Sequence, residues 1–415
     1  MAHVLLPTLG SAGDVHPFIA LGRELKGRGH RVTVLTNPLF AALVERQGLA
    51  FLPVGSEAVA RAAIGNPDVW HLVKGFSVIA QVVVPAIEEV YRLIERHAAQ
   101  DTIVAFSTLA FGARLAQEKL KVPSASIHLQ PTVIRSYQEQ GMFGNVRLSP
   151  SHPYWFKWGL FRLLDFLVLD RNLLPSLNRF RARLGLPAVS RVMHAWMHSP
   201  QLVIGFFPEW FAPVQPDWPP NLHAVGFPLW DADDAPQVTE ARDFMRAGAA
   251  PVVFTPGSAG STMQRFFAES VAAVRDLNLR AVLVTNFPEQ LPKSLPPGVR
   301  SFGYLPFSEV LPEAALLVYH GGIGTLAQGI HAGVPHLVVP HGYDQFDSGW
   351  RIEQLQLGRS IAQAQYRRRP AARAIGELLA DQDLRRRCRH MAERVDGHSA
   401  VSRAADLIEA LRAPN

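Results

Sequence analysis

The sequence predicts an α/β protein with two domains, each built around a parallel sheet. Its 415 residues exceed the roughly 100–200 residues of a typical single domain, so we expect two domains. The same order of strand, glycine-rich turn, helix and strand begins near residue 4 and again near residue 251, with a proline-rich segment between them. Hydrophobic residues make up 48% and charged residues 18%, which excludes an intrinsically disordered chain and a coiled coil.

The first domain begins with an apolar run at residues 4–9, which a glycine-rich turn at 10–14 closes. A helical pattern of apolar residues follows at 18–26, and a β-branched run at 31–35 predicts the next strand. Strand, helix and strand in this order are typical of a parallel βαβ unit.

The second domain repeats the order with a strand at 251–255, a glycine-rich turn at 257–261, a helical stretch to about residue 277, and a strand at 281–284. Parallel sheets of this kind bind ligands outside the carboxyl ends of their strands. We therefore expect two Rossmann-like domains that face a cleft.

The domain boundary is predicted from the seven prolines of residues 208–236, since proline disfavours helix at itself and at the preceding residue. We place an N-terminal domain at 1–225, a linker at 226–249 and a C-terminal domain at 250–415. Residues 371–412 are helical in pattern, and we expect this C-terminal helix to pack back onto the first domain.

Charge and cysteine content restrict the classes of partner. The formal net charge is +6 and the basic runs are only three residues long, so we expect an anionic ligand and no nucleic acid. A single cysteine, Cys388, excludes an internal disulfide and a cysteine-based zinc site. Without a signal-peptide pattern or a span of about 18 apolar residues, we expect a cytoplasmic protein. Peripheral contact with the inner membrane and the oligomeric state stay open.

The first glycine-rich turn does not fit a nicotinamide dehydrogenase. Gly10 and Gly13 are spaced Gly-x-x-Gly, whereas dinucleotide binding requires Gly-x-Gly-x-x-Gly. The second strand ends at Thr36 and Asn37, without the acid that would bind a ribose hydroxyl.

The most informative segment is residues 320–325, which reads His-Gly-Gly-Ile-Gly-Thr between an apolar run and a helical stretch. Glycines at a helix start expose backbone N–H groups to an anion, and the helix dipole adds about half a positive charge. His320 can add a donor, and the later pair Asp344 and Gln345 offers groups suited to sugar hydroxyls. The segment predicts a diphosphate-sugar site.

These residues carry a resemblance to a known family. Residues 320–345 resemble the donor-binding signature of the UDP-glycosyltransferase-like families, which have the GT-B fold, and residues 10–18 are similar to the N-terminal loop of sterol and glycopeptide glycosyltransferases. Residues 196–200, 207–213 and 226–229 resemble the catalytic subunit of the bacterial rhamnosyltransferases that make rhamnolipids. The resemblance implies an inverting transfer of a sugar from a nucleotide donor, bound by the C-terminal domain, to a hydroxyl of an acceptor bound by the N-terminal domain.

The resemblance also implies a general base in the first loop, where many relatives have a histidine oriented by an aspartate. Here Asp14 occupies that position, and the strand at residues 103–106 ends in Ser107 and Thr108 without an acid. A carboxylate can accept the proton directly, so Asp14 is the predicted base, with His16 as its rival. Asp14 could instead cap the next helix, and Pro17 predicts that Val15 and His16 lie in an extended loop.

On the donor side, the resemblance implies that His320 and backbone amides bind the phosphates, that Ser258 contacts a phosphate and that Tyr304 and Leu305 lie against the nucleobase. Asp344 and Gln345 would bind the sugar. The predicted donor-binding set is completed by Gly13, Gly322, Ile323, Gly324 and Thr325. We expect no metal and no cofactor besides the nucleotide sugar. His194 and His198 have zinc-pair spacing, but a structural role explains them more simply.

The acceptor is indicated by the aromatic-rich stretch 154–169. Core packing is its ordinary explanation, but aromatics beside basic residues also suit a lipophilic acceptor or an anionic bilayer. The preferred hypothesis is transfer from dTDP-L-rhamnose to a 3-hydroxyacyl lipid acid, as in rhamnolipid synthesis.

Three alternatives stay open. The first is a UDP-glucose-dependent enzyme acting on a sterol, polyphenol or macrolide. The second is a sugar-nucleotide 2-epimerase, which would place acid and base groups around the donor sugar. The third is a non-catalytic subunit that binds a nucleotide sugar or a lipid.

Overall fold

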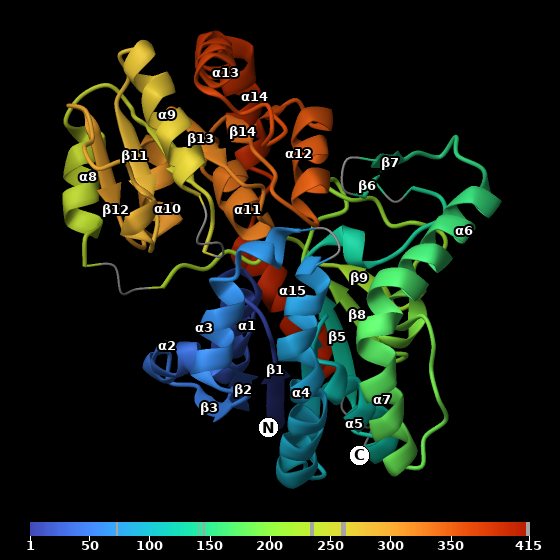
Figure 1. Ribbon diagram of the computed structural model, residues 1–415. Helices are drawn as coiled ribbons and strands as arrows, with labels where there is room; N and C mark the ends of the chain where they lie inside the picture. Colours follow the sequence, from blue (N-terminus) through green and yellow to red (C-terminus); the bar gives the residue numbers. More distant parts are fainter. Residues whose placement is uncertain (72–73, 140, 144–145, 233–235, 259–262, 412–415) are drawn as a thin grey trace. The chain divides into compact units, whose positions relative to one another are not determined.

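The computed structural model describes residues 1–71, 74–139, 141–143, 146–232, 236–258 and 263–411. Residues 259–261 of the second predicted turn lie outside this part of the chain. The protein forms two compact units, the first from residues 1–141, 147–230 and 397–415 and the second from 142–146 and 231–396 (Figure 1). Each unit contains a parallel sheet, which confirms the predicted α/β class.

The sheet of the first unit has the strand order β3-β2-β1-β4-β5-β8-β9. Its strands all run parallel. Successive strands are added on one side of β1 and then, from β4 onward, on the other side, so the order reverses between β1 and β4. The strands are β1 (His3–Pro7), β2 (Arg31–Thr36), β3 (Ala50–Pro53), β4 (Thr102–Ser107), β5 (Ser124–His128), β8 (Leu202–Gly205) and β9 (Leu222–Ala224).

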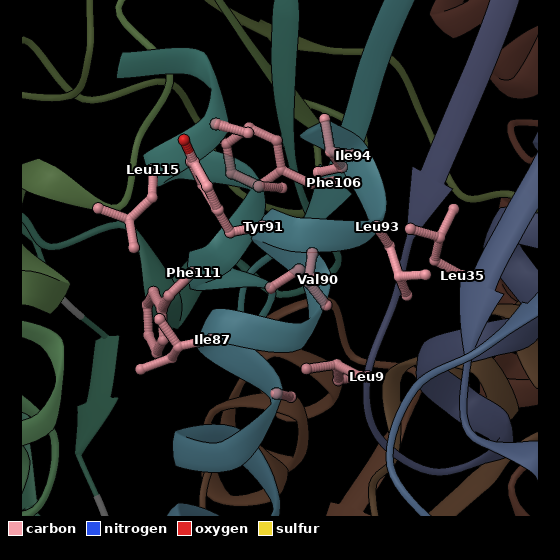
Figure 2. Close-up of a cluster of buried hydrophobic side chains, with 14 of the residues drawn as sticks. Leu9, Leu35, Ile87, Val90, Tyr91, Leu93, Ile94, Phe106, Phe111 and Leu115 are labelled. Atoms are coloured by element: carbon pink, nitrogen blue, oxygen red, sulfur yellow. The ribbon is translucent and has the colours of Figure 1, made fainter. Parts of the chain in front are cut away.

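Helices α4 and α5 form the best-defined part of the core of this unit. Figure 2 shows Tyr91 and Ile87 of α4 beside Phe111 of α5, in a cluster that Phe106 of β4 joins. Fully buried β4 has no polar alternation, as expected for a parallel strand covered on both faces. The helices of the unit are α1 (Ala12–Gly27), α2 (Ala41–Arg46), α3 (Glu57–Ile64), α4 (Lys74–His97), α5 (Phe111–Leu120), α6 (Tyr154–Leu164), α7 (Arg171–Arg183) and α15 (Gly397–Glu409), with π-helical turns at Asp165–Asp170 and Val192–Trp196.

The second unit repeats the design with the strand order β12-β11-β10-β13-β14-β15, again parallel. The order reverses between β10 and β13. Its strands are β10 (Val252–Thr255), β11 (Ala281–Val284), β12 (Val299–Phe302), β13 (Leu316–Tyr319), β14 (His336–Val338) and β15 (Gly358–Ser360). Its helices are α8 (Val238–Arg246), α9 (Gln264–Asp276), α10 (Phe307–Val310), α11 (Ile323–His331), α12 (Gln345–Gln354), α13 (Arg368–Ala380) and α14 (Gln382–Ala392), and β6 (Gly141–Phe143) pairs with β7 (Val146–Leu148) as a separate ribbon.

Helix α1 begins earlier than the sequence predicted. It starts at Ala12, so Val15 and His16 are helical and not in an extended loop, and Pro17 lies inside the helix. Proline there removes one hydrogen bond, to the carbonyl of Gly13. Gly13 is exposed, so water can reach that carbonyl, and the proline is tolerated.

The C-terminal stretch forms three helices instead of one. The first two, α13 and α14, belong to the second unit, and α15 belongs to the first. The guanidinium of Arg28, the C-cap residue of α1, fixes α15 through Asp406 at 2.5 Å, Glu409 at 3.1 Å and the hydroxyl of Ser402 at 2.7 Å. His30 adds a 2.6 Å bond to Glu409.

Within the segment predicted as a linker, 226–249, the described residues include helix α8 at Val238–Arg246. Residues 226–230 belong to the first unit, and α8 belongs to the second. Gly226 has φ +114, and a Cβ there would lie 3.1 Å from Ala400 of α15, so this segment packs within its unit. No helix in the described ranges is long and apolar enough to cross a membrane.

Candidate active site

The second unit brings two glycine-rich loops together at the point where its strand order reverses. Strands β10 and β13 are neighbours with Thr255 opposite Tyr319, so the loops that follow them begin side by side. The imidazole of His320 lies between Gly257 and Gly322: a Cβ on Gly257 would be 2.6 Å from its Nε2, and a Cβ on Gly322 would be 2.8 Å from its Cε1. Only glycine leaves room for the ring at both positions.

Burial keeps His320 neutral. Its side chain is buried, and this burial lowers its pKa to about 3, with a smaller contribution from His341. Its Nδ1 is buried without a hydrogen-bond partner in the described part of the chain. At neutral pH the ring therefore offers one N–H donor and no formal charge.

Helix α11 presents an uncapped N-terminus beside this ring. Gly322 is its N-cap residue in an extended conformation (φ −61, ψ 135) with no side-chain cap, and its carbonyl already accepts from Leu326 N at 2.9 Å. The first N–H groups of a helix have no intrahelical partner, which here means those of Ile323, Gly324 and Thr325. Together with the helix dipole they favour an anion at this end.

Helix α12 begins against the same loop. A Cβ on Gly321, which has φ +96, would lie 2.9 Å from the carbonyl of Gln345. The side-chain oxygen of Gln345 accepts from the backbone N–H groups of His341 at 2.8 Å and Gly342 at 3.1 Å. These bonds fix its orientation and leave its Nε2 as a donor for a ligand. Asp344 lies at the N-cap position of α12 and is partly buried.

Tyr304 and Leu305 lie elsewhere on this unit, after β12, which is two strands from β10. The hydroxyl of Tyr304 accepts from Ala232 N at 2.8 Å, and Leu305 is buried. The start of the predicted linker supports this loop, because the carboxylate of Asp231 accepts from Ser308 N at 2.8 Å and so caps α10. Ser258, in the loop after β10, is exposed.

In the first unit, the corresponding reversal point joins the loops after β1 and β4. The backbone N–H of Leu9 donates to the hydroxyl of Ser107 at 3.3 Å. Asp14 follows in the first turn of α1, where its Oδ2 accepts from Ser11 N at 2.8 Å and from Ser11 Oγ at 3.1 Å. The carboxylate lies directly over Gly10, where a Cβ would be 2.5 Å from its Cγ.

Asp14 is thus a helix cap through one oxygen, and its Oδ1 is the oxygen left for other chemistry. Burial raises the pKa of this carboxyl, and the Ser11 hydrogen bonds partly oppose the rise. A carboxylate with a raised pKa is a stronger base than an exposed one.

His16 points to a different side of the helix, because residues two positions apart do not face each other. Its ring packs edge-on against Trp230 at 4.8 Å between centroids, and burial lowers its pKa to about 4. Gly13, between Asp14 and the cap, is exposed.

Comparisons with known proteins agree with this architecture. Residues 4–132 match the glycosyltransferase family 28 N-terminal domain, and residues 270–410 match the C-terminal domain of proteins like erythromycin biosynthesis protein CIII. This protein belongs to the GT-B glycosyltransferases. It is 28% identical over 431 residues to the O-mycaminosyltylonolide 6-deoxyallosyltransferase of Streptomyces fradiae, covering 98% of this chain and 96% of the relative.

Solved structures support the fold of the glycosyltransferase over its whole length. The glycosyltransferase of kitacinnamycin superposes with a TM-score of 0.75 at 22% identity, covering 99% of both chains. The spinosyn rhamnosyltransferase, solved with thymidine diphosphate, superposes with a TM-score of 0.66 at 18% identity, covering 98% of this chain and all of that one.

The glycosyltransferase also contains a buried series of hydrogen-bonded side chains that the sequence did not reveal. The hydroxyl of Thr108, after β4, and Nδ1 of His128, at the end of β5, are 2.9 Å apart, and Nε2 of His128 is 2.9 Å from Nδ1 of His198. Burial lowers the pKa of His198 to about 4 and holds that of His128 well below its ordinary value, so both are neutral. His198 therefore pairs with His128 and not with His194.

The expectation that no metal is needed stays a prediction. Within the described ranges, the glycosyltransferase has no group of three or more His, Cys, Asp and Glu side chains that could hold a metal ion. The roles of the individual site residues stay predictions.

Proposed function

We propose that this glycosyltransferase transfers a sugar, with inversion, from a nucleotide diphosphate donor to a hydroxyl of a lipophilic acceptor. The observation that carries the proposal is the position of His320, which is held by two glycines beside the uncapped start of α11. This arrangement offers only N–H donors to a ligand, so it suits a diphosphate best.

Departure of the diphosphate would be stabilised by these donors without a metal. The neutral ring of His320 and the amides of Gly324 and Thr325 would contact the phosphate oxygens, and the dipole of α11 would oppose their developing charge. Ser258 is exposed in the adjacent loop and would add a hydroxyl. The Nε2 of Gln345 and the carboxylate of Asp344 would bind the sugar hydroxyls.

Asp14 is the proposed base. Its Oδ2 holds the helix cap, which fixes the carboxylate, and Oδ1 would take the acceptor proton as the oxygen attacks the anomeric carbon. The raised pKa of this carboxyl suits a base. The neutral imidazole of His16 is the alternative base, and its contact with Trp230 favours a role in shaping the acceptor site instead.

The proposed donor is dTDP-L-rhamnose and the proposed acceptor a 3-hydroxyacyl lipid acid. Support comes from the likeness to rhamnolipid rhamnosyltransferases and from two relatives whose names include a 6-deoxyallosyl transfer and a spinosyn rhamnosyl transfer, the latter with thymidine diphosphate. The second candidate is a macrolide acceptor, favoured by the full-length similarity to the mycaminosyltylonolide enzyme, with UDP-glucose as the alternative donor.

A competition experiment separates these possibilities. The purified protein is incubated with equal concentrations of dTDP-L-rhamnose and UDP-glucose, together with a 3-hydroxyacyl lipid acid, a macrolactone and a sterol. Products are identified by mass. A deoxyhexose on the lipid supports the first candidate, and a deoxyhexose on the macrolactone supports the second. A hexose on any acceptor refutes the proposed donor.

The same experiment tests the proposal as a whole. A donor that is bound but returned unchanged with every acceptor would indicate a binding subunit. An altered sugar on a nucleotide, with no acceptor modified, would indicate an epimerase.

A further inference from the structure

The helix α6 and the π-helical turn that follows it expose an unusual concentration of large apolar side chains. Of the ten exposed large hydrophobic residues among the described residues, seven lie in this one segment. Trp155 is 72% exposed and Phe166 is 73% exposed. We call this set the aromatic face; it consists of Tyr154, Trp155, Phe156, Trp158, Leu163, Phe166 and Leu167.

The segment is amphipathic in the reverse of the usual sense, because two of its charged residues point inward. Lys157 is almost fully buried, and its ammonium donates to the carbonyls of Tyr137 at 2.7 Å and Gln138 at 2.8 Å. Asp165 is also almost fully buried, with Arg135 at 2.6 Å and Arg191 at 3.2 Å. If the outer face of this helix met only water, we would expect its charged residues on that face and its tryptophans packed against the protein.

The π-helical turn determines where the aromatic face ends. Lys157, Phe161 and Asp165 are four residues apart and form the buried stripe, and the next buried position, Asp170, follows after five. The extra residue rotates the helix, so that α7 has an ordinary apolar stripe facing the core. The outward apolar face is therefore confined to α6 and this turn.

The exposed charged residues of this segment itself are of one sign. The only acidic residues between positions 150 and 187 are Asp165 and Asp170, and both are buried. Arg162 and Arg171 are exposed, and the guanidinium of Arg162 lies 4.8 Å from the ring centroid of Trp158. Tryptophan and tyrosine next to arginine are typical of the boundary between lipid head groups and acyl chains.

We propose that the aromatic face docks on an anionic lipid bilayer. The apolar rings enter the head-group region, and the arginines bind anionic lipid phosphates. The absence of exposed acids on this segment favours a negatively charged surface over a second copy of the same basic face, which would repel it. This surface shares the stretch that indicates a lipophilic acceptor, but it uses no residue assigned to donor binding or catalysis, so vesicle binding can be tested apart from sugar transfer.

Vesicle sedimentation tests the docking. The purified protein is mixed with vesicles of phosphatidylcholine containing about one third phosphatidylglycerol, and with vesicles of phosphatidylcholine alone. We expect binding to the anionic vesicles that falls about tenfold or more in W155S/F166S, since binding scales with the apolar area inserted. The matched control is V214S, which changes an exposed apolar residue of the same unit and should bind like the parent.

A charge pair separates electrostatics from insertion. R162E and R61E each lower the formal net charge by two, and Arg61 is an exposed residue of α3. We expect R162E to bind the anionic vesicles more weakly than the parent and R61E to bind them like the parent. Equal binding to both kinds of vesicle, or equal losses in R162E and R61E, would overturn the proposal. A third outcome would also overturn it: the parent protein fails to sediment with vesicles but forms a concentration-dependent dimer, and W155S/F166S abolishes that dimer. This result would show that a second copy covers the aromatic face.

Discussion

The space around His320 leads to a sharp prediction for Gly322→Ala. Gly322 has φ −61, which any residue can adopt, so the substitution causes no backbone strain. The new methyl group would lie 2.8 Å from Cε1 of His320 and closer still to Nε2. Gly257 also lies against the ring, since a Cβ there would be 2.6 Å from Nε2, and this restricts movement of the ring toward Gly257.

The size of the effect follows from this overlap. Two carbons at optimal separation are about 3.5–4.0 Å apart, so relieving the Cε1 contact alone requires a shift of roughly 0.7 Å, and the closer Nε2 contact requires more, unless the ring rotates out of its position. Overpacking of this kind costs about 1–3 kcal/mol. If the ring leaves, the lost hydrogen bond to a charged phosphate is worth about 1.5–3 kcal/mol, which corresponds to a roughly 10- to 150-fold weaker donor affinity.

Isothermal titration with dTDP and with UDP measures this affinity, and urea unfolding measures the stability of the second unit. The matched control is Gly376→Ala in α13 of the same unit, where the nearest atom to a new Cβ is 3.8 Å away. Wild-type values for both affinity and stability in Gly322→Ala would refute the placement of His320 and with it the phosphate site.

Three further predictions concern the rest of the protein. Asp14→Asn keeps a side-chain oxygen for the hydrogen bonds from Ser11 but removes the base, so kcat should fall about 10²–10⁴-fold with little change in the free energy of unfolding. Asp14→Ala should in addition lose about 1 kcal/mol of stability. An unchanged kcat in Asp14→Asn would transfer the role of base to His16. Arg28→Ala should destabilise the first unit by about 1 kcal/mol in urea unfolding, because it removes partly exposed ion pairs to Asp406 and Glu409 of α15. Arg23→Ala on the exposed side of α1 should have a smaller effect, and equal effects would contradict the anchoring of α15. Burial lowers the pKa of His336 to about 3, so the unfolded state takes up the proton first as the pH falls below about 6.5, and this residue alone should cost about 2 kcal/mol of stability at pH 5. His336→Gln should therefore flatten the pH dependence of the free energy of unfolding in urea. An unchanged slope would show that His336 does not stay neutral in the folded protein.

The sequence predicted the two parallel sheets because their strands are short, β-branched and bounded by glycine, and burial on both faces requires that pattern. The sequence places the start of α1 too late, because a proline such as Pro17 is favoured in the first turn of a helix, whereas α1 starts at Ala12. A signal for the true start was present, since Ser11 and Asp14 have the spacing of a capping box. The proline count between the units also indicated a linker, although much of that segment packs within the units.

The contacts that define the candidate site were beyond prediction because they join distant parts of the chain. His320 and Gly257 are 63 positions apart, and His128 and His198 are 70 positions apart, so their proximity depends on the strand order and not on local pattern. The inverted face of α6 has a similar cause. Periodicity shows that a helix has two faces, but the partners of Lys157 and Asp165 decide which face is inside.

The two positions at which the strand order reverses, between β1 and β4 and between β10 and β13, carry different chemical groups. Single variants at each position and the double variant test this difference. The first unit carries titratable side chains at its reversal point, Asp14 and His16, whereas the second offers N–H donors of a neutral ring and a helix start. Proton transfer should therefore depend on the first unit and donor affinity on the second. Asp14→Asn should lower kcat without changing the Kd of dTDP, and Gly322→Ala should raise that Kd. In the double variant, the Kd should equal that of Gly322→Ala alone, because Asp14 has no phosphate contact in the proposed mechanism. A further rise in the Kd of the double variant would show that Asp14 also contributes to donor binding.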